Sequence, residues 1–133
     1  MSTSDWKKHQ MYEKIKAILV DQKYDDKHHF ERPFLTPYQI SIEFEKRHPN
    51  EFKKIGRPIR GSNKGKEKGL SQYIARQLSQ QIKKTNKTGK ADIEGAFISQ
   101  SFVDCLRYKH KSGLIESSLV YPHPLSMFRS INK

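Results

Sequence analysis

Cysteine is almost absent from this 133-residue chain, in which Cys105 is the only one. A single cysteine excludes an intrachain disulfide and a metal site made of cysteines alone, which fits a reducing compartment. Long apolar runs are missing too: the longest aliphatic run, Ala17 to Val20, is far shorter than the roughly 20 residues that cross a membrane. The N-terminus also lacks the apolar stretch of a signal peptide. We therefore expect a soluble, cytoplasmic protein with no membrane partner.

Acidic residues are scarce in one part of the chain. The whole sequence has 26 Lys and Arg against 14 Asp and Glu, a formal net charge of +12. Residues 53–90, called the basic segment below, hold 12 Lys or Arg and one acid, Glu67, and so carry +11 of that charge. Charge concentrated in one segment is typical of a surface that binds a polyanion. The alternative is a solvated, flexible basic loop.

The length predicts a single domain over residues 1–133, with enough aromatic and aliphatic residues to exclude a fully disordered chain. A first helix is expected from about Asp5 to Gln22, capped by Ser4. Its apolar residues recur at helical spacing, at Met11, Ile15, Ile18 and Leu19.

Thr36 and Pro37 predict the start of a second helix, because Thr36 can cap free N–H groups and proline is tolerated at the first helical position. We expect this helix to end at about Arg47, before His48-Pro49-Asn50. A strand remains the alternative, since four apolar residues alternate with polar ones here: Tyr38, Ile40, Ile42 and Phe44.

The basic segment divides into two parts. Four glycines between residues 53 and 69 predict a loop, which does not have the spacing of a phosphate-binding P-loop. Residues 71–84 predict a helix with one buried row at Leu70, Ile74, Leu78 and Ile82. No Asp or Glu occurs from residue 68 to 91, and the outward residues have side chains that can reach bases and phosphates: Gln72, Arg76, Ser79, Gln80 and Lys83.

The C-terminal part is predicted to hold one more helix and one strand. After a basic connector at 84–90, Asp92 could cap an amphipathic helix that includes Ile98 to Lys111 and ends at Gly113. Cys105 lies on its apolar side and is interpreted as a packing residue. A strand is expected from Leu114 to Tyr121 and is stopped by residues 122–124. The apolar tail at 125–131 could pack in the core or dock a second copy of the chain.

Two motifs flank this arrangement: Leu35-Thr36-Pro37-Tyr38-Gln39-Ile40 ahead of the basic helix, and Lys111-Ser112-Gly113-Leu114-Ile115-Glu116 after it. Together they resemble the winged helix-turn-helix superfamily of DNA-binding domains over residues 35–121. The resemblance implies an α+β, mainly helical fold with three or four helices and a small β-hairpin or wing.

Two assignments of its helices compete. In the first, residues 36–47 form the positioning helix and 71–84 the recognition helix. In the second, residues 71–84 position the domain and 98–111 enter the groove. The second brings Asp104 close to phosphate, so electrostatics favours the first.

The leading functional hypothesis is a nucleic-acid-binding protein, with duplex DNA favoured over RNA, in a regulatory or accessory role such as transcription regulation, with no cofactor or metal. A homodimer would suit paired half-sites. The candidate phosphate-binding and groove-reading residues are Lys53, Lys54, Arg57, Arg60, Lys64, Lys66, Lys68, Gln72, Arg76, Gln80, Lys83, Lys84 and Lys87.

Other classes have less support in the sequence. A small metal-dependent nuclease is the alternative, through the acid-x-Lys spacings that begin at Asp25 and Glu51, although an enzyme is not our expectation. A module that binds an acidic protein or RNA is a third class. The loop at 24–33 holds Asp25, Asp26, His28, His29 and Glu31, and we interpret it as solvated rather than as a metal site.

Overall fold

The computed structural model describes residues 4–60, 69–99, 101–103, 105–116 and 125–131. Over these residues the protein is α+β, with helices α1 (Asp5–Lys8), α2 (Met11–Val20), α3 (Pro37–Arg47), α4 (Pro49–Ile55) and α5 (Leu70–Thr88). Its strands are β1 (Ile93–Ile98), β2 (Arg107–His110), β3 (Gly113–Glu116) and β4 (Leu125–Ser130). Among the described helices, none combines the length and the apolar character that crossing a membrane requires.

The N-terminal helix is confirmed in its buried face but is broken in two. Ser4 caps α1, and Met11, Ile15, Ile18 and Leu19 are all buried on α2. Between the two helices Gln10 has a left-handed backbone, with φ of 49°. The break turns α1 away from α2, which a continuous row of apolar residues did not indicate.

The second helix is confirmed, and the alternation typical of a strand was misleading. Thr36 and Gln39 form a reciprocal capping box, in which the Gln39 N–H donates to Thr36 Oγ1 and the Thr36 N–H donates to Gln39 Oε1 at 2.8 Å. These local bonds fix the start of α3. The chain does not turn into a loop after His48, because Pro49 starts the short helix α4, which was not predicted.

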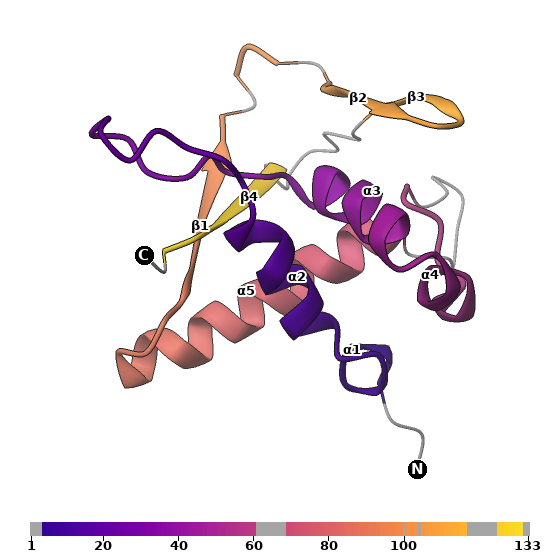
Figure 1. Cartoon of the computed structure of the whole chain (residues 1–133), viewed down its shortest axis with the longest axis horizontal. Coiled ribbons are helices and arrows are strands. Elements are labelled where there is room, and N and C mark those ends of the chain that lie inside the picture. The colour runs from indigo at the N-terminus through magenta and orange to yellow at the C-terminus, as the bar shows by residue number, and fades with distance from the viewer. Residues whose placement is uncertain (1–3, 61–68, 100, 104, 117–124, 132–133) are drawn as a thin grey trace.

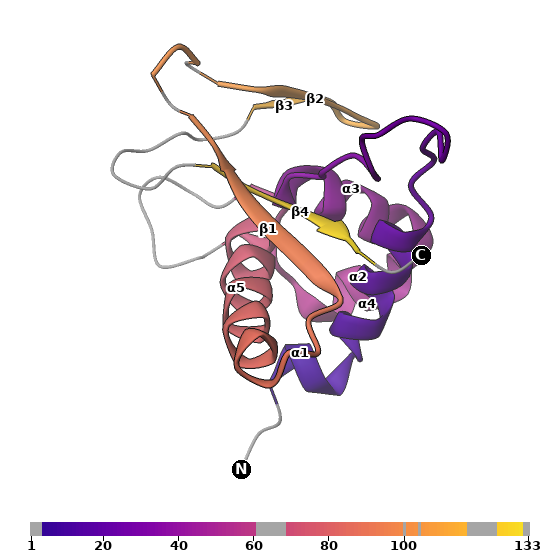
Figure 2. The same cartoon turned by 90° about the vertical axis from the view of Figure 1, so that its left-hand side faces the viewer.

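The core lies between α2, α3, α5 and the β1–β4 pair (Figure 2). β1 and β4 pair antiparallel in a register that joins Ile93 to Ser130 and Ile98 to Leu125. On its other side β4 is bridged to Leu35, where the N–H and carbonyl of Leu35 and Phe128 exchange two hydrogen bonds of 2.8 Å. The order across this sheet is therefore residue 35, β4, β1.

The second antiparallel pair, β2–β3, lies apart from the first and packs against α3 (Figure 1). Tyr108 stacks on Tyr38 with ring centroids 5.3 Å apart. His110 Nε2 lies 2.6 Å from Glu45 Oε1. Lys111 Nζ lies 3.3 Å from the other carboxylate oxygen of Glu45. The Tyr38–Tyr108 stack and the contacts of Glu45 with His110 and Lys111 thus attach this hairpin to α3.

Two sequence predictions for the C-terminal half were wrong. None of the described residues from 98 to 111 is helical, because Ile93 to Ile98 pair with β4 and Arg107 to His110 form β2. Gly113 is not a helix C-terminus but begins β3, where it pairs with His110 and has φ of 119°. The apolar stretch at 125–131 packs in the core, one of the two roles expected for it, since Leu125 and Phe128 are buried in β4.

Two further predictions hold in part. The 84–90 connector is mostly helix, because α5 continues to Thr88 and ends at Gly89. The strand predicted at 114–121 is present as β3 up to Glu116. Residues 117–121 and the stop at 122–124 lie outside the described residues.

Candidate nucleic-acid interface

Helix α5 separates its apolar and polar residues cleanly. Leu70, Ile74 and Leu78 are completely buried against the core, and Ser71 is buried beside them. At about 100° per residue, the residues on the opposite side of the helix share one face. All of them are exposed: Gln72, Arg76, Ser79, Gln80, Lys83, Asn86 and Lys87. We call these residues the α5 face, and Lys84 lies exposed along its edge.

The cations of α5 form no ion pair with any described residue, whereas several cations elsewhere in the protein do. Elsewhere the carboxylates hold their cations closely, as in Lys16–Asp92 at 2.6 Å, Arg129–Glu94 at 2.7 Å and Arg47–Asp21 at 2.9 Å. Arg76, Lys83, Lys84 and Lys87 take part in none of the described pairs. Their charge is therefore not neutralised by the described part of the protein.

The chain ahead of α5 is fastened to the first turn of the helix. The N–H groups of Leu70 and Ser71 donate to the carbonyls of Pro58 and Ile59, at 2.6 and 3.2 Å. Ile59 is itself buried. These bonds satisfy donors that a helix start leaves free, and they hold the exposed Arg60 beside the N-terminus of α5.

The candidate residues of the predicted loop are divided among several places. Lys53 and Lys54 are exposed, but they lie in the last turn of α4 rather than in a loop. Lys64, Lys66 and Lys68 lie outside the described residues. The predicted loop at 53–69 thus contains a helical turn at its start, and the charges described there are those of Lys53, Lys54, Arg57 and Arg60.

Arg57 is engaged inside the protein. Its Nε lies 3.6 Å from an Asp5 carboxylate oxygen, and its guanidinium lies over the Tyr73 ring at 4.2 Å. The Tyr73 hydroxyl in turn accepts a hydrogen bond of 3.0 Å from the Trp6 N–H. Arg57 therefore joins α1 to α5 and covers the only aromatic ring of the basic segment.

Glu51, the acid of one predicted acid-x-Lys match, also has partners within the protein. It lies 2.8 Å from Lys14 Nζ and 3.4 Å from His9 Nδ1. The hydrogen bond from Lys14 lowers the pKa of Glu51 below its usual value, while partial burial opposes this shift. Asp26, from the other match, lies in the loop on the far side of the molecule from α4 (Figure 1). The two matches do not form a common site.

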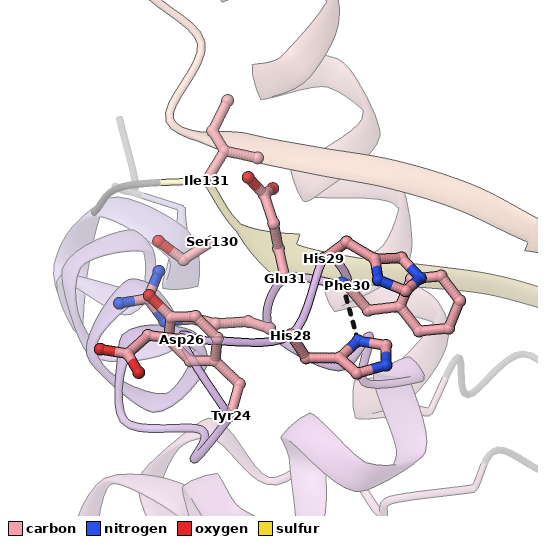
Figure 3. Close-up of a pocket in the computed structure, with 9 residues that line it drawn as sticks. Tyr24, Asp26, His28, His29, Phe30, Glu31, Ser130 and Ile131 are labelled. Atoms are coloured by element: carbon pink, nitrogen blue, oxygen red, sulfur yellow. Dashed lines mark hydrogen bonds between the residues drawn. The ribbon is translucent and has the colours of Figure 1, made fainter.

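The loop at 24–32 surrounds a hollow of about 300 Å³ (Figure 3). His28 and His29 stack at 4.2 Å, and the Phe30 N–H donates to His28 Nδ1 at 3.0 Å. Within the described ranges, His, Cys, Asp and Glu side chains nowhere gather in threes in a way that could hold a metal ion. The hollow lies between the loop and the end of β4, where Ser130 and Ile131 also line it.

Sequence reasoning missed α4 and the fastening of residues 58–59 to α5. A signal for α4 was present: Pro49 stands at its first position, and Gly56 follows with a left-handed φ of 71°, as helix ends favour. The attachment of residues 58–59 to α5 consists of backbone hydrogen bonds, which leave no recognisable pattern in the sequence.

Comparisons with known proteins give no relative: no family model, no curated protein and no solved structure matches the chain.

Proposed function

We propose that this protein binds duplex DNA and that the α5 face enters the major groove, in a cytoplasmic regulatory or accessory role. The observation that carries the proposal is the long helix α5, whose exposed face has several unpaired cations and no acid. The 19 residues of α5 give a length of roughly 28 Å. This is enough for several turns to follow a groove about 12 Å wide.

The side chains of the α5 face are suited to binding base edges in a groove as well as phosphates. Arginine can donate two hydrogen bonds to guanine, and glutamine can pair with adenine. Arg76 and Gln80 lie one helical turn apart on this face, and Gln72 lies one turn before Arg76. Lys83, Lys84 and Lys87 follow toward the C-terminus, where they would contact phosphates.

The arrangement of the elements also supports a winged-helix interpretation. The order along the chain is α2, the bridging residue Leu35, α3, α5, β1 and β4. The order across the sheet is residue 35, β4, β1. Helix α3 packs against α5, as a positioning helix packs against a recognition helix. Because none of the described residues from 98 to 111 is helical, we favour the first of the two helix assignments. Helix α4 and the residues after it are an insertion between the two helices.

Duplex DNA is favoured over single-stranded RNA because the ring of Tyr73 is not free to stack on a base. Single strands are bound through bases stacked on exposed aromatic rings. Tyr73 is the only aromatic residue from residue 53 to 90, and its ring is covered by Arg57. The α5 face therefore offers charge and hydrogen bonds but no stacking surface.

The proposal is tested by titrating a fluorescent random-sequence duplex with the protein at several salt concentrations. If six or more phosphates are contacted, the affinity should fall by about three decades or more between 50 and 200 mM salt. Single-stranded DNA and double-stranded RNA of equal length serve as competitors and should compete less well. An affinity that does not change with salt would contradict the proposal.

A further inference from the structure

We infer that β1 and the residues just after it form a surface for a second copy of this chain, through antiparallel pairing of the outer edge of β1. This inference does not depend on the proposed DNA binding. It rests on the edge of β1, on the exposed aromatic residues beside it and on the charge around it.

The outer edge of β1 is not paired with any described residue. In the sheet, β4 lies between residue 35 and β1, so β1 is the last strand. The end of β1 extends past α5 (Figure 2). A strand at the edge of a sheet presents free N–H and carbonyl groups, which another strand can pair with.

Two large apolar side chains lie exposed in β1 and shortly after it in the chain. Phe97, in β1, is 69% exposed, and Phe102, five residues further on, is 97% exposed. Most large apolar residues of β1 and β4 are instead buried or half-buried, as Ile93 and Phe128 show. Exposed aromatic residues next to an unpaired edge are typical of a contact surface rather than of a solvated one.

The charge around β1 favours a copy of the chain over a nucleic acid. No Lys or Arg occurs from residue 91 to 106, although one residue in about five of the whole chain is basic. The two acids at β1 are already neutralised, Asp92 by Lys16 and Glu94 by Arg129. The described residues of β1 therefore offer no unpaired cation to a phosphate. Two copies of a chain with a charge of +12 can approach each other at this neutral strand without strong repulsion.

The sequence of β1 gives the register of the pairing. An antiparallel pair on a two-fold axis is self-complementary. If the axis passes through Ala96, Phe97 of each copy lies opposite Gly95 of the other. Ile82 and Phe128 already pack over the side-chain face of Gly95, so the ring of Phe97 would extend this apolar contact from the neighbouring strand. Glu94 then lies opposite Ile98 and the two Glu94 residues do not face each other. One strand pair buries less area than a stable dimer interface needs, so we expect a weak dimer that depends on concentration.

The first test is sedimentation velocity of the full chain over a wide concentration range. The wild-type protein should show a monomer–dimer equilibrium, and Phe97→Glu should raise the dimer dissociation constant by at least about tenfold. Phe30→Glu is the matched control, because Phe30 is 71% exposed but lies in the loop at 24–32. This control should dimerise like the wild type. A circular dichroism spectrum confirms that both variants are folded.

The second test reads the register directly. With Cys105→Ser as background, Ala96→Cys places one thiol at the two-fold axis, where opposite residues lie about 5 Å apart and a disulfide can form. Mild oxidation should give a covalent dimer for Ala96→Cys and much less for Ser112→Cys in the β2–β3 turn. A wild-type protein that stays monomeric and gives no Ala96→Cys dimer would overturn the inference. So would a dimer that Phe97→Glu leaves unchanged.

Discussion

Ser41 of α3 and Ser71 of α5 share a buried hydrogen bond, with their Oγ atoms 3.1 Å apart. Both residues are at most 2% exposed. The bond fixes how α3 crosses α5 and so orients the α5 face relative to the rest of the domain.

Removing one of these hydroxyls should destabilise the protein. In Ser41→Ala the Ser71 hydroxyl loses its partner in the core, which should lower the free energy of unfolding by roughly 1–2 kcal/mol in urea titrations. The double variant with Ser71→Ala should lose less than the sum of the two single losses. Ser79→Ala, on the exposed side of α5, is the control and should change stability little. Equal costs for Ser41→Ala and Ser79→Ala would contradict the importance of the buried bond.

The left-handed backbone at Gln10 should make glycine favourable there. Gln10→Gly removes the clash of Cβ at φ of 49° and should raise the free energy of unfolding by roughly 0.5–1 kcal/mol. Gln72→Gly, inside α5, is the control and should instead lower it by about 1 kcal/mol. Thermal unfolding of both variants measures the difference. The interpretation of the α1–α2 break would be wrong if Gln10→Gly destabilised the protein as Gln72→Gly does.

The Lys14–Glu51 pair should make stability depend on pH in the acidic range. The hydrogen bond from Lys14 keeps the pKa of Glu51 below its unfolded value of 4.5. The stabilisation is therefore fully present above that value and is lost as the pH falls through the lower pKa of the folded state. Glu51→Gln should lower the free energy of unfolding by about 1 kcal/mol at pH 7, because the pair is partly exposed.

This pH dependence is checked by urea titrations at several pH values from 7 down into the acidic range. The difference between wild type and Glu51→Gln should shrink as the pH falls. Glu13→Gln is the control, because Glu13 is an exposed residue of α2 without a described ion pair. A difference between wild type and Glu51→Gln that stays constant with pH would show that the charge of Glu51 does not matter.

The elements that local signals define could be predicted from the sequence. The cap at Thr36 acts within the first turn of α3, and the apolar row of α5 repeats within one helix. The cap and the exposed, acid-free outer face were confirmed, although the part of Gln39 in the cap was not predicted. In the apolar row Leu70, Ile74 and Leu78 are buried and Ile82 is half-buried. The distribution of the basic residues over α4, Arg60 and α5 was not predicted, because α4 itself was missed. Pro49 was interpreted only as the end of α3, whereas it is also the first residue of α4.

The C-terminal half could not be predicted in the same way, since its structure depends on distant partners. Phe102, Cys105 and Leu106 have helical spacing, but β1 before them pairs with β4, which begins only at Leu125. The alternation of Tyr108 and His110 and the turn residues Ser112 and Gly113 that follow were the available signals for a hairpin. Which residues of β4 are buried follows only from its place between β1 and Leu35.

The central claim, that the α5 face binds duplex DNA, is tested most directly by two double variants that lose the same charge. Arg76→Gln with Lys83→Gln removes two cations from the α5 face. Lys23→Gln with Lys27→Gln removes two exposed cations at and beside the loop at 24–32. The affinity of each for one labelled duplex is measured by fluorescence anisotropy at a single salt concentration. The account predicts at least about a tenfold weaker affinity for the α5 pair and a much smaller change for the other pair. Equal losses in the two variants would contradict it, because binding would then follow net charge alone.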